Sequence, residues 1–333
     1  MLLNRFGVER KKGKFQVWVF DKAESRKLRM AVEDVTVEGD FNALTLDNWV
    51  MSFEEALGRV EDLAAPHLAQ IVATTSIADL SVEARGAICI FAALQFIRGR
   101  DSRIKFADMA EKLRDRLMAE GVAPGSQAEE FLKLPEPKDL KIHSFQMIQN
   151  HLGEFAAHFV VKDLLLLEAP QEHEFLIGDA PVVMSNSRDF GPMGNIGLAV
   201  LGIEIYLPIS PKLTLAFYCP SLLGGMRESL AHAQAEIRRL KALTVLGRAD
   251  VAVDAGAKIA QLQPGIEYNE AVLSAHRVGS PLLCVADNMF HCNSLQIAGA
   301  ERWIISRSGD FGLVDRMISD NPKFRAGRRA TFF

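Results

Sequence analysis

The sequence predicts an α+β fold, and three observations support this. Helical periodicity dominates the first half of the chain. The second half mixes short apolar runs, separated by proline and glycine, with further helices, and strands and helices do not alternate regularly in either half. Because regular alternation is typical of a doubly wound parallel sheet, its absence favours α+β. The 333 residues are enough for one large or two modest domains.

The first half opens with β structure. Residues 14–21 alternate in the manner of a strand, and residues 26–35 supply a hairpin partner after the turn at Asp21. Apolar side chains repeated every three or four positions then predict three helices, at residues 50–72, 81–99 and 104–120. Ser81 is the expected N-cap of the second helix, and Gly99 its expected stop.

Residues 121–139 contain three prolines and two glycines and are predicted to be a linker. Two divisions stay open: an N-terminal part of residues 1–120 followed by a mixed part of residues 140–333, or one continuous domain.

The second half begins with a long helix predicted for residues 140–168. Short strands are expected at residues 175–177, 182–185, 203–207, 213–218 and 302–308. Further helices are expected at residues 228–246 and 269–278.

Composition excludes several classes of protein. The formal charge of −4 gives no global attraction for nucleic acid or anionic lipid. The four cysteines form no C-x-x-C pair, which favours a reducing cytoplasm. The longest apolar window, residues 87–97, is too short to span a bilayer. No cofactor or partner is indicated, and a homo-oligomer stays open.

No nucleotide-binding loop, H-E-x-x-H or G-x-S-x-G motif is present, so candidate site residues come from their placement. Glu54 and Glu61 lie about 20° apart around the first helix, beside its apolar face. Two carboxylates there suit acid–base chemistry or a metal, and salt bridges to a neighbouring helix are the alternative.

A cationic corner closes the second predicted helix. Arg98 shares a face with Ile90 and Leu94, Gln95 lies nearby, and Arg103 follows. One interpretation is an anion or phosphate clamp, for which arginine is suited. The other is an ion pair with Glu54 or Glu61; in a buried pair, replacing Arg98 with alanine costs roughly 3–5 kcal/mol.

Two other groups of polar residues have ordinary explanations. His151, Glu154 and His158 share a helical face, but their spacing matches no established ligand set, so we predict no metal site there. Asp179 ends a strand before Ala180 and Pro181, which is typical of a turn.

The chain resembles a bacterial family of unknown function, DUF4238. The matching stretches occur in the family's order along nearly the whole chain: "LLNRFG", "VWVFDK", the helix with Glu54 and Glu61, "FAALQFIRGRDSR", "FLIGDAPVV", "LPISPKLTL" and "NSLQIAGAERWIIS". The resemblance implies importance, without an activity, for Gln95, Arg98, Asp179, Pro181, Pro208, Ser210, Pro211 and Asn293. Asn269, in "NEAVLSAHR", is a rival to Asn293, which is preferred because a predicted strand follows it.

One departure from the family pattern stands out. Members usually carry a paired-histidine lead, H-H-x-x-P, before the L-x-x-F element, whereas Met1 almost directly precedes "LLNRF" here. If those histidines act in catalysis or ligate a metal, this chain is impaired or its start is mis-assigned.

These observations lead to one expectation of function and one alternative. We expect a hydrolase acting on a phosphate-containing or other anionic substrate. Its catalytic residues are Asp179, Glu54, Glu61 and Asn293, and its substrate-binding residues are Gln95, Arg98 and Arg103. Asp179 is accordingly expected to point into a polar cluster containing an arginine. The alternative is a non-catalytic binding protein in which the same residues form a structural polar network.

Overall fold

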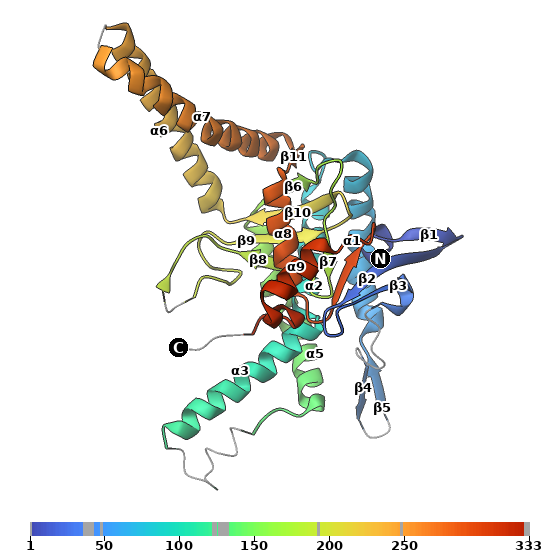
Figure 1. Cartoon of the computed structure of the whole chain (residues 1–333). Helices are drawn as coiled ribbons and strands as arrows, with labels where there is room; N and C mark the ends of the chain where they lie inside the picture. The colour runs from blue at the N-terminus through green and yellow to red at the C-terminus, as the bar shows by residue number, and fades with distance from the viewer. Residues whose placement is uncertain are drawn as a thin grey trace.

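The computed structural model describes residues 2–35, 43–46, 49–121, 125, 133–191, 194–246 and 249–329; the side chains of residues 43–46, 49–51 and 249–253 are outside the description. Two five-stranded sheets with helices packed around them confirm the α+β class (Figure 1). Most of the predicted linker, residues 122–124 and 126–132, lies outside the described residues. In the described ranges no helix is both long and apolar enough to cross a bilayer.

The first sheet is antiparallel and is assembled from distant parts of the chain. Its strands are β1 (Val8–Lys11), β2 (Lys14–Asp21), β3 (Arg26–Ala31), β7 (Ile177–Gly178) and β12 (Trp303–Ser306). The β2–β3 pairing confirms the predicted hairpin. β3 covers one edge of β2, β1 and β12 share the other edge, and β7 pairs with β12. The parts of the chain before and after the predicted linker therefore contribute to one sheet.

The second sheet has the order β11 (Pro281–Leu283), β6 (Asp163–Glu168), β10 (Leu213–Tyr218), β9 (Glu204–Pro208) and β8 (Val183–Ser185). Its pairings are antiparallel, except that β11 runs parallel to β6. The helix predicted for residues 140–168 is wrong over its last part, because helix α5 (Pro137–Val160) ends before β6. The four leucines of β6 alternate between two core clusters, so this strand is apolar on both faces.

The largest core cluster lies between the sheets, around helix α2 (Val82–Ile97), which is buried on most of its surface. The Ser81 side chain accepts a hydrogen bond from the Ala84 amide at 3.1 Å, confirming the predicted N-cap. Helix α1 (Glu54–Thr74) begins later than predicted, because Trp49–Ser52 forms strand β5, paired with β4 (Ala43–Leu46). Helix α3 (Arg100–Ala119) follows α2 after Gly99.

The remaining helices lie in the second half. Helices α6 (Pro220–Val245) and α7 (Ala249–Val278) pack as a hairpin that projects from the body of the molecule (Figure 1). Both begin earlier than predicted, α6 with Pro220 in its first turn, a position that proline favours. Helices α8 (Ala286–Gly299) and α9 (Gly312–Asp320) were not predicted. Residues of α8 contribute to core clusters on both sheets, and the short helix η4 (Pro322–Arg325) follows α9.

Candidate functional site

Asp179 directly follows β7 and accepts three backbone hydrogen bonds from the start of β12. Its Oδ1 accepts from the Glu301 amide at 2.8 Å, and its Oδ2 accepts from the amides of Arg302 at 2.8 Å and Trp303 at 3.1 Å. Burial raises the pKa of the Asp179 carboxyl, while these amides and the charge of Lys22 act in the opposite direction. An ionised carboxylate offers about four lone-pair sites, so about one remains for a ligand or a proton.

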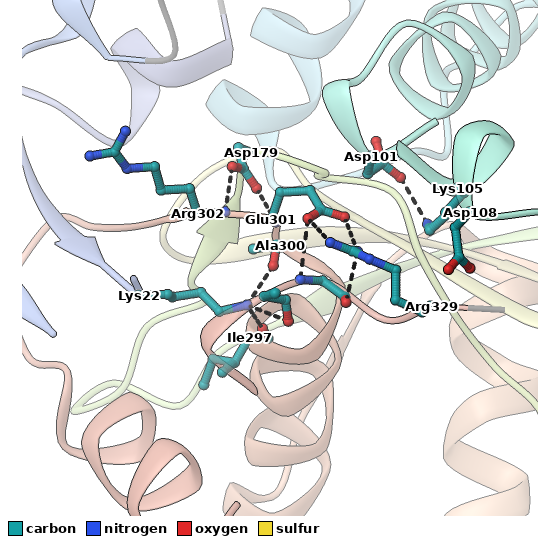
Figure 2. Close-up of polar contacts among 12 residues, drawn as sticks. Lys22, Asp101, Lys105, Asp108, Asp179, Ile297, Ala300, Glu301, Arg302 and Arg329 are labelled. Atoms are coloured by element: carbon teal, nitrogen blue, oxygen red, sulfur yellow. Dashed lines mark hydrogen bonds and ion pairs between the residues drawn. The ribbon is translucent and has the colours of Figure 1, made fainter. Parts of the chain in front are cut away.

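The arginine near Asp179 takes part through its backbone. The Arg302 side chain points away from Asp179 (Figure 2) and donates to Asp21, with Nη2 2.7 Å from Oδ2. Asp179 therefore bonds to residues distant in sequence, which the local turn interpretation did not anticipate. Asp179 does lie in a polar cluster, but the arginine expected as its charged partner is wrong, because Arg302 contributes a backbone amide that any residue could supply. The basic group whose charge acts on Asp179 is Lys22.

Two amides of α8 hold the backbone on the other side of β7. Asn293 accepts from the Leu176 amide at 2.8 Å and donates to the Glu174 carbonyl at 2.9 Å. One helical turn later, Gln296 accepts from the Gly178 amide at 2.9 Å and donates to the Pro181 carbonyl at 2.8 Å. Together they satisfy backbone groups along the segment that leads to Asp179.

Lys22 is fully buried at the carboxyl end of α8. Its ammonium donates to the carbonyls of Ile297, at 2.6 Å, and Ala300 (Figure 2). A cation at this end of a helix interacts favourably with the helix dipole. Burial lowers the pKa of Lys22 to about 8, although the charges of Asp179 and Glu301 partly oppose that shift.

The segment after η4 attaches to the same place. Arg329 forms a bidentate pair with Glu301, whose side chain is 5% exposed, at 2.7 and 3.0 Å (Figure 2). Gly327 lies so close to Glu301 that a Cβ at this position would stand 2.4 Å from Oε1. Glu301 thus binds this segment with its side chain and binds Asp179 with its backbone amide.

A cleft of about 590 Å³ opens in front of Asp179, between α1, the α2–α3 junction and the first sheet. We name it the Arg98 cleft. The candidate residues that line it are Glu54, Glu61, Gln95, Arg98 and Asp179. Gly99, the N-cap of α3, lines it as well, so the positive end of a helix dipole faces the same space. Five of the seven candidate side chains thus come together.

Arg98 pairs with Glu61 inside this cleft and donates to Gln95 Oε1 at 3.1 Å, which confirms the predicted ion pair. The pair is less buried than expected, because the Arg98 and Glu61 side chains are 29% and 22% exposed. We therefore revise the expected cost of losing Arg98 to about 1–2 kcal/mol. The Nε2 amide of Gln95 is buried and finds no hydrogen-bond partner in the described part of the chain.

The other two candidates lie outside the Arg98 cleft. Asn293 lines a different cleft, on the far side of β7, where its amide is engaged with the backbone as described. Arg103 lies on α3, its guanidinium carbon 5.9 Å from the ring centroid of Phe145, and does not line the Arg98 cleft.

The histidine face on α5 is open to solvent. His151 Nδ1 lies 3.0 Å from Glu154 Oε2, and both side chains are substantially exposed. Within the described parts of the chain, no group of three or more His, Cys, Asp or Glu side chains is arranged to hold a metal ion. The absence of a metal site at this face stays a prediction.

Sequence reasoning missed Lys22, Gln296 and Glu301. Lys22 follows the alternating strand at a position assigned to a turn, where a lysine gives no local sign of burial. Gln296 follows Asn293 by three positions, and this spacing on one helical face is a signal that could have found it. Glu301 has no comparable signal, because its partner Arg329 lies 28 positions later in the chain and shares no local pattern with it.

Comparison with known proteins agrees with this arrangement. A model of the family described as "Protein of unknown function (DUF4238)" matches residues 1–310. No curated protein and no solved structure gives a significant match. The matched region contains both sheets, the Arg98 cleft and the Asp179 contacts, whereas Arg329 lies beyond it. Since the match covers most of the sequence, the chain belongs to the DUF4238 family.

Proposed function

We propose that this protein is a cytoplasmic hydrolase that acts on a phosphate-containing or other anionic substrate bound in the Arg98 cleft. One observation carries the proposal: an arginine, the amino end of a 20-residue helix and a carboxyl group with a raised pKa line the same cleft. Four free cysteines suit the reducing cytoplasm.

Anion recognition rests on Arg98 and the start of α3. A guanidinium forms strong charge-assisted hydrogen bonds with phosphate or carboxylate oxygens, and the amino end of a helix favours negative charge. Glu61 pairs with Arg98, so an anion that binds Arg98 must replace Glu61 as its partner. Because this pair is partly exposed, the exchange costs less desolvation than it would in the core.

Asp179 is the proposed acid. Hydrolysis adds water across the bond to the leaving group, whose oxygen needs a proton. A carboxyl with a raised pKa retains its proton to a higher pH than usual and is better suited to supply it. The three amide bonds fix its orientation. Glu54, exposed at the start of α1, is the proposed base that receives a proton from the attacking water.

A second candidate function is non-catalytic binding. The observation that favours it is that the hydrogen bonds of Asp179, Asn293 and Gln296 go to backbone groups of this chain, as expected for structural support. In this case the Arg98 cleft binds an anion without turning it over.

The experiment compares hydrolysis of p-nitrophenyl phosphate and bis(p-nitrophenyl) phosphate with phosphate binding measured by calorimetry. We expect turnover by the wild type, loss of turnover with retained binding in Asp179→Asn, and binding about tenfold or more weaker in Arg98→Met. Arg59→Met is the matched control, since Arg59 pairs with Glu55 on the exposed face of α1.

Phosphate binding without turnover of either ester would favour the second function. If the wild type neither binds phosphate nor hydrolyses an ester, or if Arg98→Met and Arg59→Met behave alike, the Arg98 cleft is not an anion site.

A further inference from the structure

A second cleft, of about 900 Å³, lies on the far side of β7, and none of the described residues lines both it and the Arg98 cleft. It is formed by the ends of β6 and β10, the start of α8 and the connection between β12 and α9. We name it the Arg5 cleft; its lining includes Arg5, Glu174, Lys212, Phe290, Arg307 and Arg316. Neither the family description nor the function proposed above assigns it a role.

Arg5 lines this cleft and has no acidic partner among the residues that the structure describes. Its guanidinium donates to the carbonyls of Leu68 at 3.1 Å and Ala65 at 3.3 Å on α1. Its Nε is buried and makes no hydrogen bond, and burial lowers the pKa of the side chain. A partly buried cation that contacts only neutral groups is stabilised when an anion binds to it.

Three further cations line the same space. Arg307 and Arg316 are exposed, and within the described residues neither forms an ion pair with a carboxylate. The Lys212 ammonium donates to the carbonyls of Pro170, Gln171 and His173 at 3.1, 2.7 and 2.6 Å, so its charge too is solvated by neutral groups.

Two carboxylates that line the cleft, those of Glu174 and Asp310, already accept hydrogen bonds from the chain's own donors. Glu174 accepts from the Ser308 amide at 3.1 Å and from the hydroxyls of Ser306 and Ser308. Asp310 accepts from the Gly312 amide at 2.9 Å. Two other glutamates of the cleft, Glu168 and Glu172, belong to the end of β6 and the loop after it. Glu174 and Asp310 are therefore engaged by the chain's own donors, whereas Arg5, Arg307 and Arg316 form no ion pair with a carboxylate of the described residues.

The remaining wall is apolar. Phe290 on α8 is 37% exposed, although large aromatic side chains are usually covered. Val72, Pro211 and Leu313 line the cleft beside it. A site with an apolar wall and a few convergent charges suits a small molecule that has both an apolar body and a charged group.

We propose that the Arg5 cleft binds a small organic anion with an apolar body, of the class of medium-chain carboxylates. The anionic group contacts Arg5, Arg307 and Arg316, and the apolar body lies on Phe290 and its neighbours. Charge and apolar surface are both required for binding, so an inorganic anion or a neutral molecule of the same length binds more weakly.

The test is calorimetric titration of the full chain with octanoate, octan-1-ol and inorganic phosphate, each at constant ionic strength. We expect one octanoate per chain, with octanol about tenfold or more weaker, because one charge-assisted contact is lost. If phosphate binds as tightly as octanoate, and if this binding is lost in the arginine variants below, the cleft is a site for inorganic anions. Equal binding of octanol and octanoate would show a plain apolar cleft. Either result overturns the proposal, as does an absence of octanoate binding.

Variants of the lining residues test whether octanoate binds in the Arg5 cleft. The double variant Arg307→Ala with Arg316→Ala should weaken octanoate binding about tenfold or more. Phe290→Ser should also weaken octanoate binding, and phosphate should not become the better ligand of this variant. Arg238→Ala on α6 is the matched control, since Arg238 is exposed and lines neither cleft. All replaced residues are at least partly exposed, and thermal melts check that each variant folds. Wild-type affinity in the double arginine variant refutes the assignment.

Discussion

Asp179→Asn separates a turn-forming aspartate from one that joins two distant segments. Asparagine bends the backbone much as aspartate does, so a turn-former tolerates the exchange. At Asp179, however, the two carboxylate oxygens accept three amides, and asparagine offers one oxygen and one NH₂ group. In its best orientation the oxygen keeps the Arg302 and Trp303 amides, and the NH₂ group faces the amide of Glu301.

The magnitude follows from this count. An amide left without an acceptor in a buried place costs about 1–3 kcal/mol. Removing the carboxylate also removes the burial penalty that raises its pKa, which offsets part of the loss. We expect the free energy of unfolding at pH 7 to fall by about 1–2 kcal/mol.

Urea unfolding followed by circular dichroism measures the loss. Asp189→Asn is the matched control, because Asp189 is exposed and, among the described residues, accepts only the Gly191 amide, at 2.8 Å, as a local turn-former does. It should change stability by less than about 0.5 kcal/mol. If Asp179→Asn proves equally silent, or stabilises the protein, the three amides do not depend on the carboxylate and the reasoning fails.

Three other perturbations test the contacts around α8 and the free cysteines. Arg329→Ala should lower the free energy of unfolding by about 2 kcal/mol, because it leaves the buried Glu301 unpaired, whereas Arg328→Ala should not; equal effects would contradict a specific pair. The pKa of Lys22 is lowered from 10.5 to about 8, so between pH 8 and pH 10.5 the unfolded chain binds more protons than the folded protein. The free energy of unfolding of the wild type should therefore rise with pH in this range relative to that of Lys22→Met. A parallel pH dependence of the two proteins would show that the pKa shift is absent. Iodoacetamide should modify Cys219 first: the Ser221 hydroxyl, nearby amides and Lys162 outweigh burial and lower its pKa, whereas burial raises the pKa of Cys89, Cys284 and Cys292. Peptide mapping that finds another cysteine first would disprove this order.

Local patterns predicted the elements that depend on local chemistry. The alternation of residues 14–21 and the N-cap at Ser81 were sufficient because a strand face and a cap are defined within a few residues. Asp163–Glu168 was misassigned because an uninterrupted leucine run suits a buried helix and a two-faced buried strand equally well. Only the position of β6 inside its sheet decides between them.

The candidate site was predictable in part. The geometry of one helix predicted that Glu54 and Glu61 lie on the same side of it, and both line the Arg98 cleft. Because an arginine on an apolar face requires an acidic partner, Glu61 could be predicted as one of two candidates for Arg98. The partners of Asp179 were not predictable, since they are backbone amides near residue 301, and a backbone amide leaves no mark on the sequence. The buried place of Lys22 depends in the same way on the end of α8, a helix whose periodicity is weak.

The pairing of β2 with β12 has a consequence for biosynthesis. β2 ends at Asp21 and β12 begins at Trp303, so residues 22–302 must leave the ribosome before that edge of β2 is covered. At about 5–20 residues per second, the wait is on the order of tens of seconds. During this time Trp18–Asp21 presents unpaired backbone groups, which invite pairing with another nascent chain. A product truncated before Trp303 keeps this edge open permanently and should be prone to aggregation.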